Sequence, residues 1–244
     1  MKYFQILILL WCTTVFAADT DAFIPSVGQY VRTGNSGTVT IRRGGAGELT
    51  FAIESMGGNC HTCSVSGDIR DGLGHAAGLS GSDDAACRIA FVPDGGGLRV
   101  SSTTAGACQG YCGMRADFSG LYRKPPALCT QKSRRARRDE FFRLYQTRDF
   151  ARAVEVLEPL LAQCGEFVDW IEIDKIRNDL ALAQYHGGTP EACRETLAET
   201  RAARFANDEE LRQAFPPCDY DNYVGTAKAT WHNITLCDTP RGKH

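Results

Sequence analysis

The hydrophobic pattern divides the chain into two halves that repeat with different periods. In the first half, short runs alternate between apolar and polar residues and are bounded by glycines, at 37–42, 48–55, 87–92 and 98–100. Alternation with a period of two is typical of half-buried strands joined by tight turns. In the second half, apolar residues recur every three or four positions, which is typical of amphipathic helices. The sequence therefore predicts an α+β fold, with an N-terminal antiparallel β sandwich or barrel and a C-terminal helical domain.

The helical half shows several start and stop signals. We expect helices from near residue 132, over 150–161 and 171–185, from 189 onward, over 208–215 and over 220–236. Thr189-Pro190 combines a capping hydroxyl with a proline at the first helical position. A weak repeat at a spacing of 40 resembles tetratricopeptide hairpins, and a helical bundle with chance similarity is the alternative. The Pro125-Pro126 pair interrupts regular structure, so the domains are expected at 18–124 and 125–244.

The first 17 residues have the pattern of a secretory signal. Lys2 precedes an apolar run from 3 to 16 that contains no charge, and Val15-Phe16-Ala17 places small or modest residues at the expected cleavage site. The run is shorter than the roughly 20 residues that span a bilayer, and nothing later in the chain is apolar enough to span one. We therefore expect 1–17, including Cys12, to be a removed signal peptide. The expected product is periplasmic or secreted, and not membrane-anchored.

Cysteine usage supports an oxidising compartment. Ten cysteines follow the predicted signal: Cys60, Cys63, Cys87, Cys108, Cys112, Cys129, Cys164, Cys193, Cys218 and Cys237. An even number in an exported chain predicts disulfides. Six of them belong to or border the β half and four belong to the helical half, so each half could close its own bridges. For the helical half we expect Cys164 to pair with Cys193 and Cys218 with Cys237; for the β half the pairing stays open.

The motif Cys60-His61-Thr62-Cys63 has two possible interpretations besides structural disulfides, namely a redox pair and a zinc site. A thioredoxin-like redox pair would need its first cysteine at a helix N-terminus, and no helix is expected there. A zinc site could combine Cys60 and Cys63 with Cys108 and Cys112, but oxidation would compete with it in an exported protein. We therefore favour structural disulfides over both alternatives.

The sequence contains no recognisable catalytic constellation. Its histidines do not follow metal-ligand spacing, and neither a serine elbow nor a phosphate-binding glycine loop is present. We accordingly expect no catalytic residues, no cofactor and no metal, and a protein that is not an enzyme. The formal net charge of -2 at pH 7 argues against a general nucleic-acid binder.

Two features are candidates for contact with a partner. A basic run at the start of the first expected helix, where the helix dipole disfavours cations, consists of Lys132, Arg134, Arg135, Arg137 and Arg138. The run could attract an acidic partner or an anionic envelope polymer, or it could be a solvated linker. His61 could be a surface contact, within a β loop at 57–62 that could protrude toward a partner; the loop at 94–97 is a second candidate.

Several short segments resemble an uncharacterised family of secreted and periplasmic bacterial proteins, some loosely associated with periplasmic lysozyme inhibitors. The segments are HTC-x-V-x-G at 61–67, CRIAF at 87–91, YCGMRADFSG at 111–120, NDLALAQYH at 178–186 and KATWHN at 228–233. The main resemblance covers residues 45–123, and the helical segments accompany it in some relatives. It implies a bacterial envelope protein more firmly than it implies an inhibitor.

These observations lead to a functional expectation. We expect a non-enzymatic module that binds another envelope protein, with an inhibitor or immunity protein against a cell-wall-degrading enzyme as the specific version. One alternative is an envelope enzyme, such as a thiol-disulfide oxidoreductase that uses Cys60 and Cys63. A second alternative is an envelope assembly or scaffold factor that docks its partner on the helical half.

Overall fold

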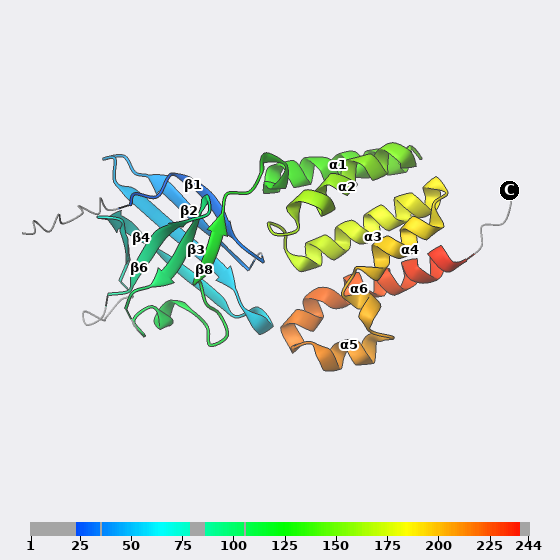
Figure 1. Cartoon of the computed structure of the whole chain (residues 1–244). Coiled ribbons are helices and arrows are strands. Elements are labelled where there is room, and N and C mark those ends of the chain that lie inside the picture. Colours follow the sequence, from blue (N-terminus) through cyan, green and yellow to red (C-terminus); the bar gives the residue numbers. More distant parts are fainter. Residues whose placement is uncertain (1–22, 35, 79–85, 105, 240–244) are drawn as a thin grey trace, which may run out of the picture.

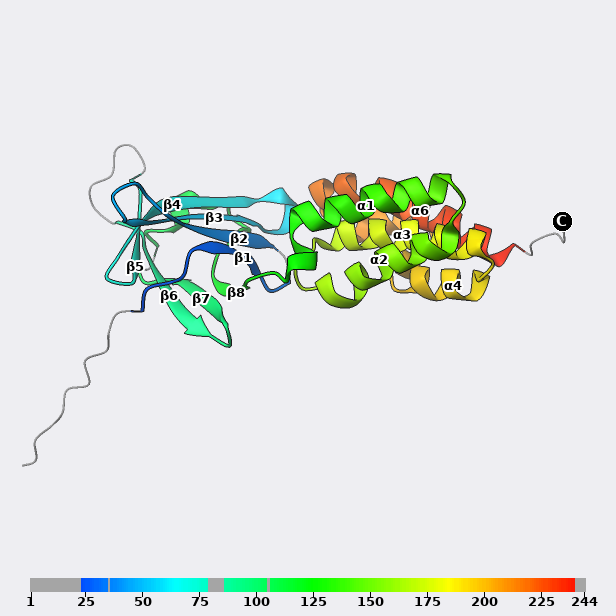
Figure 2. The same ribbon diagram turned by 90° about the horizontal axis from the view of Figure 1, so that it is seen from above.

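The computed structural model describes residues 23–34, 36–78, 86–104 and 106–239. The predicted signal at 1–17, with Cys12, lies outside the described residues. A β-barrel and a helical unit lie end to end, joined along one side by the chain that leaves the barrel (Figures 1 and 2). The expected order, a β unit followed by a helical unit, is confirmed, and of the two expected β architectures the barrel is the one observed.

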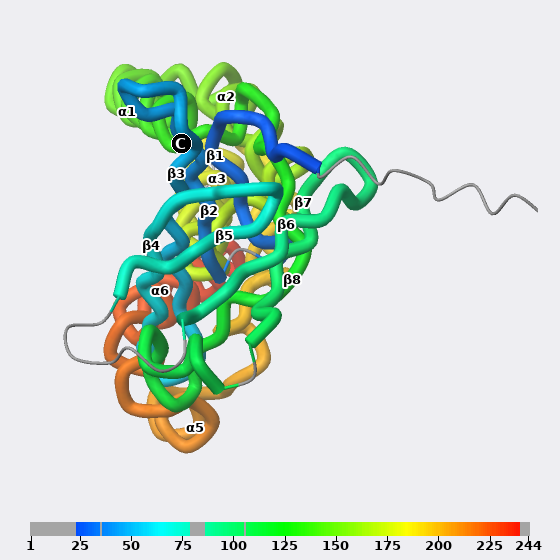
Figure 3. Tube along the Cα trace, turned by 90° about the vertical axis from the view of Figure 1, so that its left-hand side faces the viewer, coloured from blue at the N-terminus to red at the C-terminus, as the bar shows by residue number. Residues whose placement is uncertain are grey.

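The barrel is a closed antiparallel sheet. Its strands within the described residues are β1 (Gly28–Arg32), β2 (Gly37–Arg43), β3 (Leu49–Met56), β4 (Thr62–Arg70), β5 (Leu73–Ala76), β6 (Arg88–Asp94), β7 (Gly97–Ser102) and β8 (Gly120–Arg123). Each strand pairs with the next, and β8 pairs with β1; Figure 3 shows the molecule from the barrel end. Closure leaves the sheet without free edges, which would otherwise be templates for aggregation.

Alternation along the strands places one set of side chains in the barrel interior. In β3, Phe51 and Ile53 are buried while Glu54 is exposed, and Ile53 pairs with Val39 of β2 in register. Phe51 meets Phe91 of β6 edge to face across the interior, with 5.5 Å between ring centroids. The pattern of the sequence predicted β2, β3, β6 and β7. It did not predict β1, β4, β5 and β8, of which β5 and β8 have only four residues each.

The second half forms the expected helices. They are α1 (Gln131–Gln146), α2 (Phe150–Cys164), α3 (Trp170–Gly187), α4 (Pro190–Ala198), α5 (Asp208–Ala214) and α6 (Pro217–Asp238). Local capping explains several starts: Thr130 accepts from the Ser133 amide before α1, and Asp169 accepts from the Ile171 amide before α3. The buried apolar residues of the barrel and of the helices form separate clusters. No helix among the described residues is long and apolar enough to cross a membrane.

All ten expected cysteines form disulfides. The bridges are Cys60–Cys218, Cys63–Cys112, Cys87–Cys108, Cys129–Cys164 and Cys193–Cys237. Both expected pairings, Cys164 with Cys193 and Cys218 with Cys237, are wrong. Cys218 and Cys237 lie near opposite ends of the single helix α6, and a rise of 1.5 Å per residue separates them by about 28 Å, so they cannot meet.

The expectation that each half closes its own bridges is also wrong, because Cys60 of the barrel pairs with Cys218 of α6. The turn between β3 and β4 reaches the first turn of α6, while the linker from β8 to α1 crosses on the other side (Figure 1). The chain and this disulfide therefore connect the two units covalently at two separate places.

We expect the Cys60→Ser/Cys218→Ser double variant to uncouple the units. The bridge spans 158 residues of sequence, and losing a disulfide typically lowers the free energy of unfolding by about 2–5 kcal/mol. Trp170 and Trp231 both lie in helices, so tryptophan fluorescence reports the helical unit, whereas far-ultraviolet circular dichroism reports both units. The two probes should give coincident denaturation curves in the native chain and separated curves in the variant. Coincident curves in the variant would show that the linker and the noncovalent contacts couple the units without the disulfide.

Candidate functional site

A cleft of about 840 Å³ lies between the barrel and the helical unit. The barrel side is formed by the β1–β2 turn, the β3–β4 turn and the segment that carries Arg115 and Asp117. The helical side is formed by the start of α3, by Arg201 after α4, and by the turn between α5 and α6. Ligand sites occur preferentially at such interfaces between structural units, so we treat this cleft as the candidate functional site.

One border of the cleft is a helix cap that the barrel supplies to α6. Asn59 accepts a hydrogen bond from the Cys218 amide through Oδ1 at 3.0 Å, and its own amide donates to Asp219 Oδ2 at 3.0 Å. Pro216, the N-cap residue directly before α6, has no side chain that could cap the helix. This reciprocal exchange is a capping box made between two distant segments of the chain. Asn59 has a φ of 56°, in the left-handed region that asparagine tolerates better than most residues.

The disulfide next to this cap locks the same contact. Neither Cys60 nor Cys218 is buried, whereas every other bridge includes at least one buried cysteine. Asn222 of α6 donates to Cys60 Sγ at 3.2 Å. The loop at 57–62, expected as a protruding contact loop, is instead bonded to α6 and forms a wall of the cleft.

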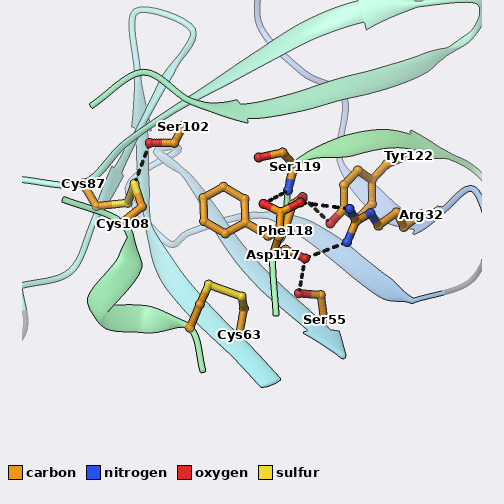
Figure 4. The surroundings of a disulfide bond; sticks show 11 residues. Arg32, Ser55, Cys63, Cys87, Ser102, Cys108, Asp117, Phe118, Ser119 and Tyr122 are labelled. Carbon is orange, nitrogen blue, oxygen red and sulfur yellow. Dashed lines mark hydrogen bonds and ion pairs between the residues drawn. A yellow bond between two sulfur atoms is a disulfide. The ribbon is translucent and has the colours of Figure 1, made fainter. Parts of the chain in front are cut away.

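The barrel side of the cleft is organised around Asp117 (Figure 4). Arg32 of β1 donates to the Asp117 carbonyl at 2.6 Å and to its carboxylate at 3.0 Å. Buried Ser55 donates to the same carbonyl at 3.0 Å, and the Ser119 amide donates to the carboxylate at 2.9 Å. Phe118 is thereby turned into the barrel, where it is 3% exposed.

Two disulfides fix the segment that carries these groups. Cys63–Cys112 and Cys87–Cys108 tie it to β4 and to the start of β6. Its backbone passes so close to the β3–β4 turn that a Cβ on Gly57 would lie 1.8 Å from the Arg115 carbonyl oxygen, so only glycine fits there. The segment consequently holds Arg115 at the cleft on a cross-linked support.

The helical side of the cleft is an aromatic stack with an arginine on it. The Trp170 ring lies 5.7 Å from the Phe215 ring and 4.6 Å from the Tyr223 ring, centroid to centroid. The Arg201 guanidinium carbon lies 4.1 Å from the Trp170 centroid, within cation–π range. Trp170, Phe215 and Arg201 all line the cleft.

A buried carboxylate holds this stack in place. Asp174 is 1% exposed and accepts from the Tyr223 hydroxyl at 2.7 Å, the Arg201 amide at 2.9 Å and Arg177 at 2.9 Å. Burial, together with the hydrogen bond to Asp174 and its negative charge, raises the pKa of Tyr223 far above its ordinary value. Tyr223 also accepts from the Ala202 amide at 2.7 Å. The backbone around Arg201 is therefore anchored to α3 and α6.

The basic run of α1 is largely engaged within the helical unit. Arg134 binds Glu172 through two hydrogen bonds of 3.0 and 3.1 Å, and Arg138 binds Asp179 at 3.1 Å. Arg137 donates to a backbone carbonyl of α2 at 3.2 Å. Burial raises the pKa of Asp179, and Arg138 counteracts this rise. These three arginines fasten α1 to its neighbouring helices.

The remaining members of the predicted contact set lie apart from the cleft. Lys132 and Arg135 are exposed and form no hydrogen bond or ion pair with any residue that the structure describes. His61 is partly buried against Gly113, where a Cβ would lie 2.7 Å from its Nδ1, and it does not line the cleft. Contact of these residues with a partner stays a prediction.

Neither alternative reading of the Cys60–Cys63 motif matches the bonds observed. Cys60 and Cys63 belong to different disulfides, so they do not form the redox pair of an oxidoreductase. The four cysteines considered for zinc are likewise all bridged. Within the described part of the chain, no group of three or more histidine, cysteine, aspartate or glutamate side chains is placed to hold a metal ion.

Sequence reasoning included Asn59 only as part of the candidate loop at 57–62, and it missed three residues that line the cleft, namely Arg115, Trp170 and Arg201. The left-handed conformation of Asn59 had a signal in the preceding Gly57-Gly58 turn. The other three come together only through the Cys60–Cys218 contact, which no local pattern indicates. Comparisons with protein-family models, curated proteins and solved structures found no match to this chain. The resemblance to the envelope family therefore stays a prediction.

We expect the Asn59→Gly variant to weaken the junction. Glycine keeps the left-handed backbone but removes the acceptor for the Cys218 amide, which should lower the free energy of unfolding by about 1 kcal/mol. Urea denaturation measures the change. Gly58→Ala, one residue earlier and facing open space, is the matched control. An unchanged stability in Asn59→Gly would show that water replaces the cap without loss.

Tyr122 should make stability depend on alkaline pH. Its hydroxyl donates to the Phe118 carbonyl at 2.7 Å, and burial raises its pKa from 10.0 to about 12, with Arg32 opposing the rise and Asp117 adding to it. The unfolded chain therefore loses this proton first, so the contribution of Tyr122 to stability is fully present below pH 10 and is lost between pH 10 and 12. The full effect is about 2–3 kcal/mol. Tyr122→Phe should flatten this part of the denaturation profile, and an equally steep profile would contradict the assignment.

Proposed function

We propose that this chain is a non-enzymatic binding module that receives a segment of another envelope protein in the cleft between its two units. The observation that carries the proposal is the construction of the cleft. Its walls are joined covalently at the linker and at Cys60–Cys218, and Asn59 reinforces the second joint. A preorganised site loses less conformational freedom on binding, which increases affinity.

The methionines of the chain support a protein partner. Apart from Met1, the sequence contains only Met56 and Met114. Met56 lines the cleft and is 53% exposed, and Met114, next to Arg115, is 90% exposed. Methionine adapts its shape to irregular apolar partners and is common at protein-binding surfaces. Met56 is therefore placed to cover an incoming segment, and Met114 is an exposed neighbour in sequence of the cleft-lining Arg115.

We further propose that the protein works in the periplasm or outside the cell, after removal of 1–17. Five disulfides are compatible with an oxidising compartment. The specific partner we propose is a cell-wall-degrading enzyme, with this chain as its inhibitor or immunity protein; the segments at 61–67, 87–91 and 111–120 are the basis for that version. We also propose that α1 to α4 are tetratricopeptide-like hairpins, because each of these helices packs on the next along the chain.

Site-specific photocrosslinking tests the proposal. A photoreactive amino acid replaces Met56 in one variant and Val92 in the other, and each protein is exposed to envelope extract of the encoding bacterium. Val92 is 50% exposed, like Met56, but lies on β6 outside the cleft. We expect one defined protein adduct from position 56 and none from position 92. The adduct partner is identified by mass spectrometry.

The specific version needs a second measurement. If the partner is a cell-wall-degrading enzyme, the purified native protein should inhibit its hydrolysis of cell walls at a one-to-one ratio. Equal adducts from both positions, or no adduct from either, would contradict binding in the cleft. A defined adduct with a protein that degrades no cell wall would retain the binding module and reject the inhibitor.

A further inference from the structure

The acidic side chains of the cleft all have hydrogen-bond partners within the chain, whereas two of its arginine side chains have none in the part that the structure describes. The acidic ones all accept hydrogen bonds from the chain itself. Glu54 accepts from Ser64 at 2.8 Å, and Asp219 accepts from the Asn59 amide. Asp169 caps α3, and Asp117 is bound by Arg32 and by a backbone amide. Each cleft carboxylate therefore already has a donor.

Two cleft guanidinium groups have no such partner. Arg115 and the guanidinium of Arg201 form no hydrogen bond or ion pair with any residue that the structure describes, whereas Arg32 is bound to Asp117. Each arginine offers five N–H donors. The cleft thus combines satisfied acceptors with two sets of free, fixed-charge donors, one on the barrel side and one on the helical side.

The position of Arg201 is determined by its surroundings. Its guanidinium lies on the Trp170 ring at 4.1 Å, and its amide is bound to buried Asp174 at 2.9 Å. This cation–π contact is no hydrogen bond to an oxygen acceptor, so the guanidinium N–H groups remain available to bind a carboxylate in a bidentate manner. Arg115 stands on the segment held by two disulfides. Both donors are consequently presented by rigid supports.

We infer that the cleft recognises a carboxylate on an acidic peptide segment, with Arg201 as its principal ligand and Arg115 as a second one. The inference rests on the proposed function and specifies which part of the partner enters the cleft. Met56, Trp170 and Phe215 provide apolar surface beside these donors, so an apolar residue next to the acidic residue completes the fit. The recognised segment is an acidic residue adjoining an aromatic or aliphatic one.

Two short peptides test this chemistry on the whole protein without residues 1–17. Ac-Gly-Glu-Phe-Glu-Gly-NH2 carries the carboxylates, and Ac-Gly-Gln-Phe-Gln-Gly-NH2 is its neutral counterpart. Binding is followed by NMR through the indole N–H signals of Trp170 and Trp231. Trp231 donates to the carbonyls of Ala202 and Phe205 at 3.0 Å each and does not line the cleft, so its signal serves as an internal reference.

We expect the Trp170 signal to shift on titration and the dissociation constant to be at least about tenfold lower for the glutamate peptide at low salt. Added salt should reduce this preference. Arg201→Gln should abolish it, and Arg201→Lys, which keeps the charge but loses the planar fork, should reduce it. Arg115→Gln should weaken it in part. Arg135→Gln removes an equally free arginine outside the cleft and should change nothing.

The inference is overturned if both peptides bind equally, if neither binds, or if Arg135→Gln weakens binding as much as Arg201→Gln. An unchanged Trp231 signal and thermal midpoint show that a variant is folded. A defined crosslink from position 56 without a preference for glutamate would reject the carboxylate and retain the binding module. A glutamate preference without any crosslinked protein would support the carboxylate site and reject the proposed protein partner.

Discussion

The contact between the β3–β4 turn and the first turn of α6 determines the arrangement of the whole molecule. A disulfide, a side-chain cap and a hydrogen bond from a barrel amide to an α6 carboxylate converge there on two consecutive barrel residues, Asn59 and Cys60. The barrel and the helices have separate apolar cores, so their relative position comes from this contact together with the linker and the ion pair between Arg123 of β8 and Glu166. Without it the cleft would have two independent walls and no defined shape.

Within each unit, buried or cross-linked groups fix the backbone that carries the exposed side chains of the cleft. Asp174 lies in the interior of the helical unit, yet it sets the backbone at Arg201 through one hydrogen bond and the Tyr223 ring through another. Two disulfides do the same for Arg115 on the barrel side. A buried carboxylate is tolerated only when its acceptor positions are filled, and here three donors fill them. The two free guanidinium groups therefore belong to exposed side chains whose backbone is held in place.

Local sequence patterns predicted the elements well and their assembly poorly. Periodicity identified all six helices and four of the strands, because apolar spacing and caps such as Thr189-Pro190 are local properties. The strand β5 was not predicted, since its four residues include Gly74 and show little alternation. The disulfide partners were misassigned because pairing depends on which helices lie side by side. The cleft could not be predicted from the sequence, since Trp170 and Arg115 become neighbours of one cavity only through a bridge spanning 158 residues.

The order of the cysteines along the chain has a consequence for biogenesis. Only two of the five bridges, Cys87–Cys108 and Cys129–Cys164, join cysteines that are consecutive in the sequence. Cys60–Cys218 encloses three others and interlocks with Cys193–Cys237. If the chain is oxidised while it emerges N-terminus first, the first cysteine with which Cys60 can pair is Cys63, because Cys218 emerges much later. Maturation therefore requires a disulfide isomerase, and a host that has only a thiol oxidase would accumulate protein with incorrectly paired disulfides.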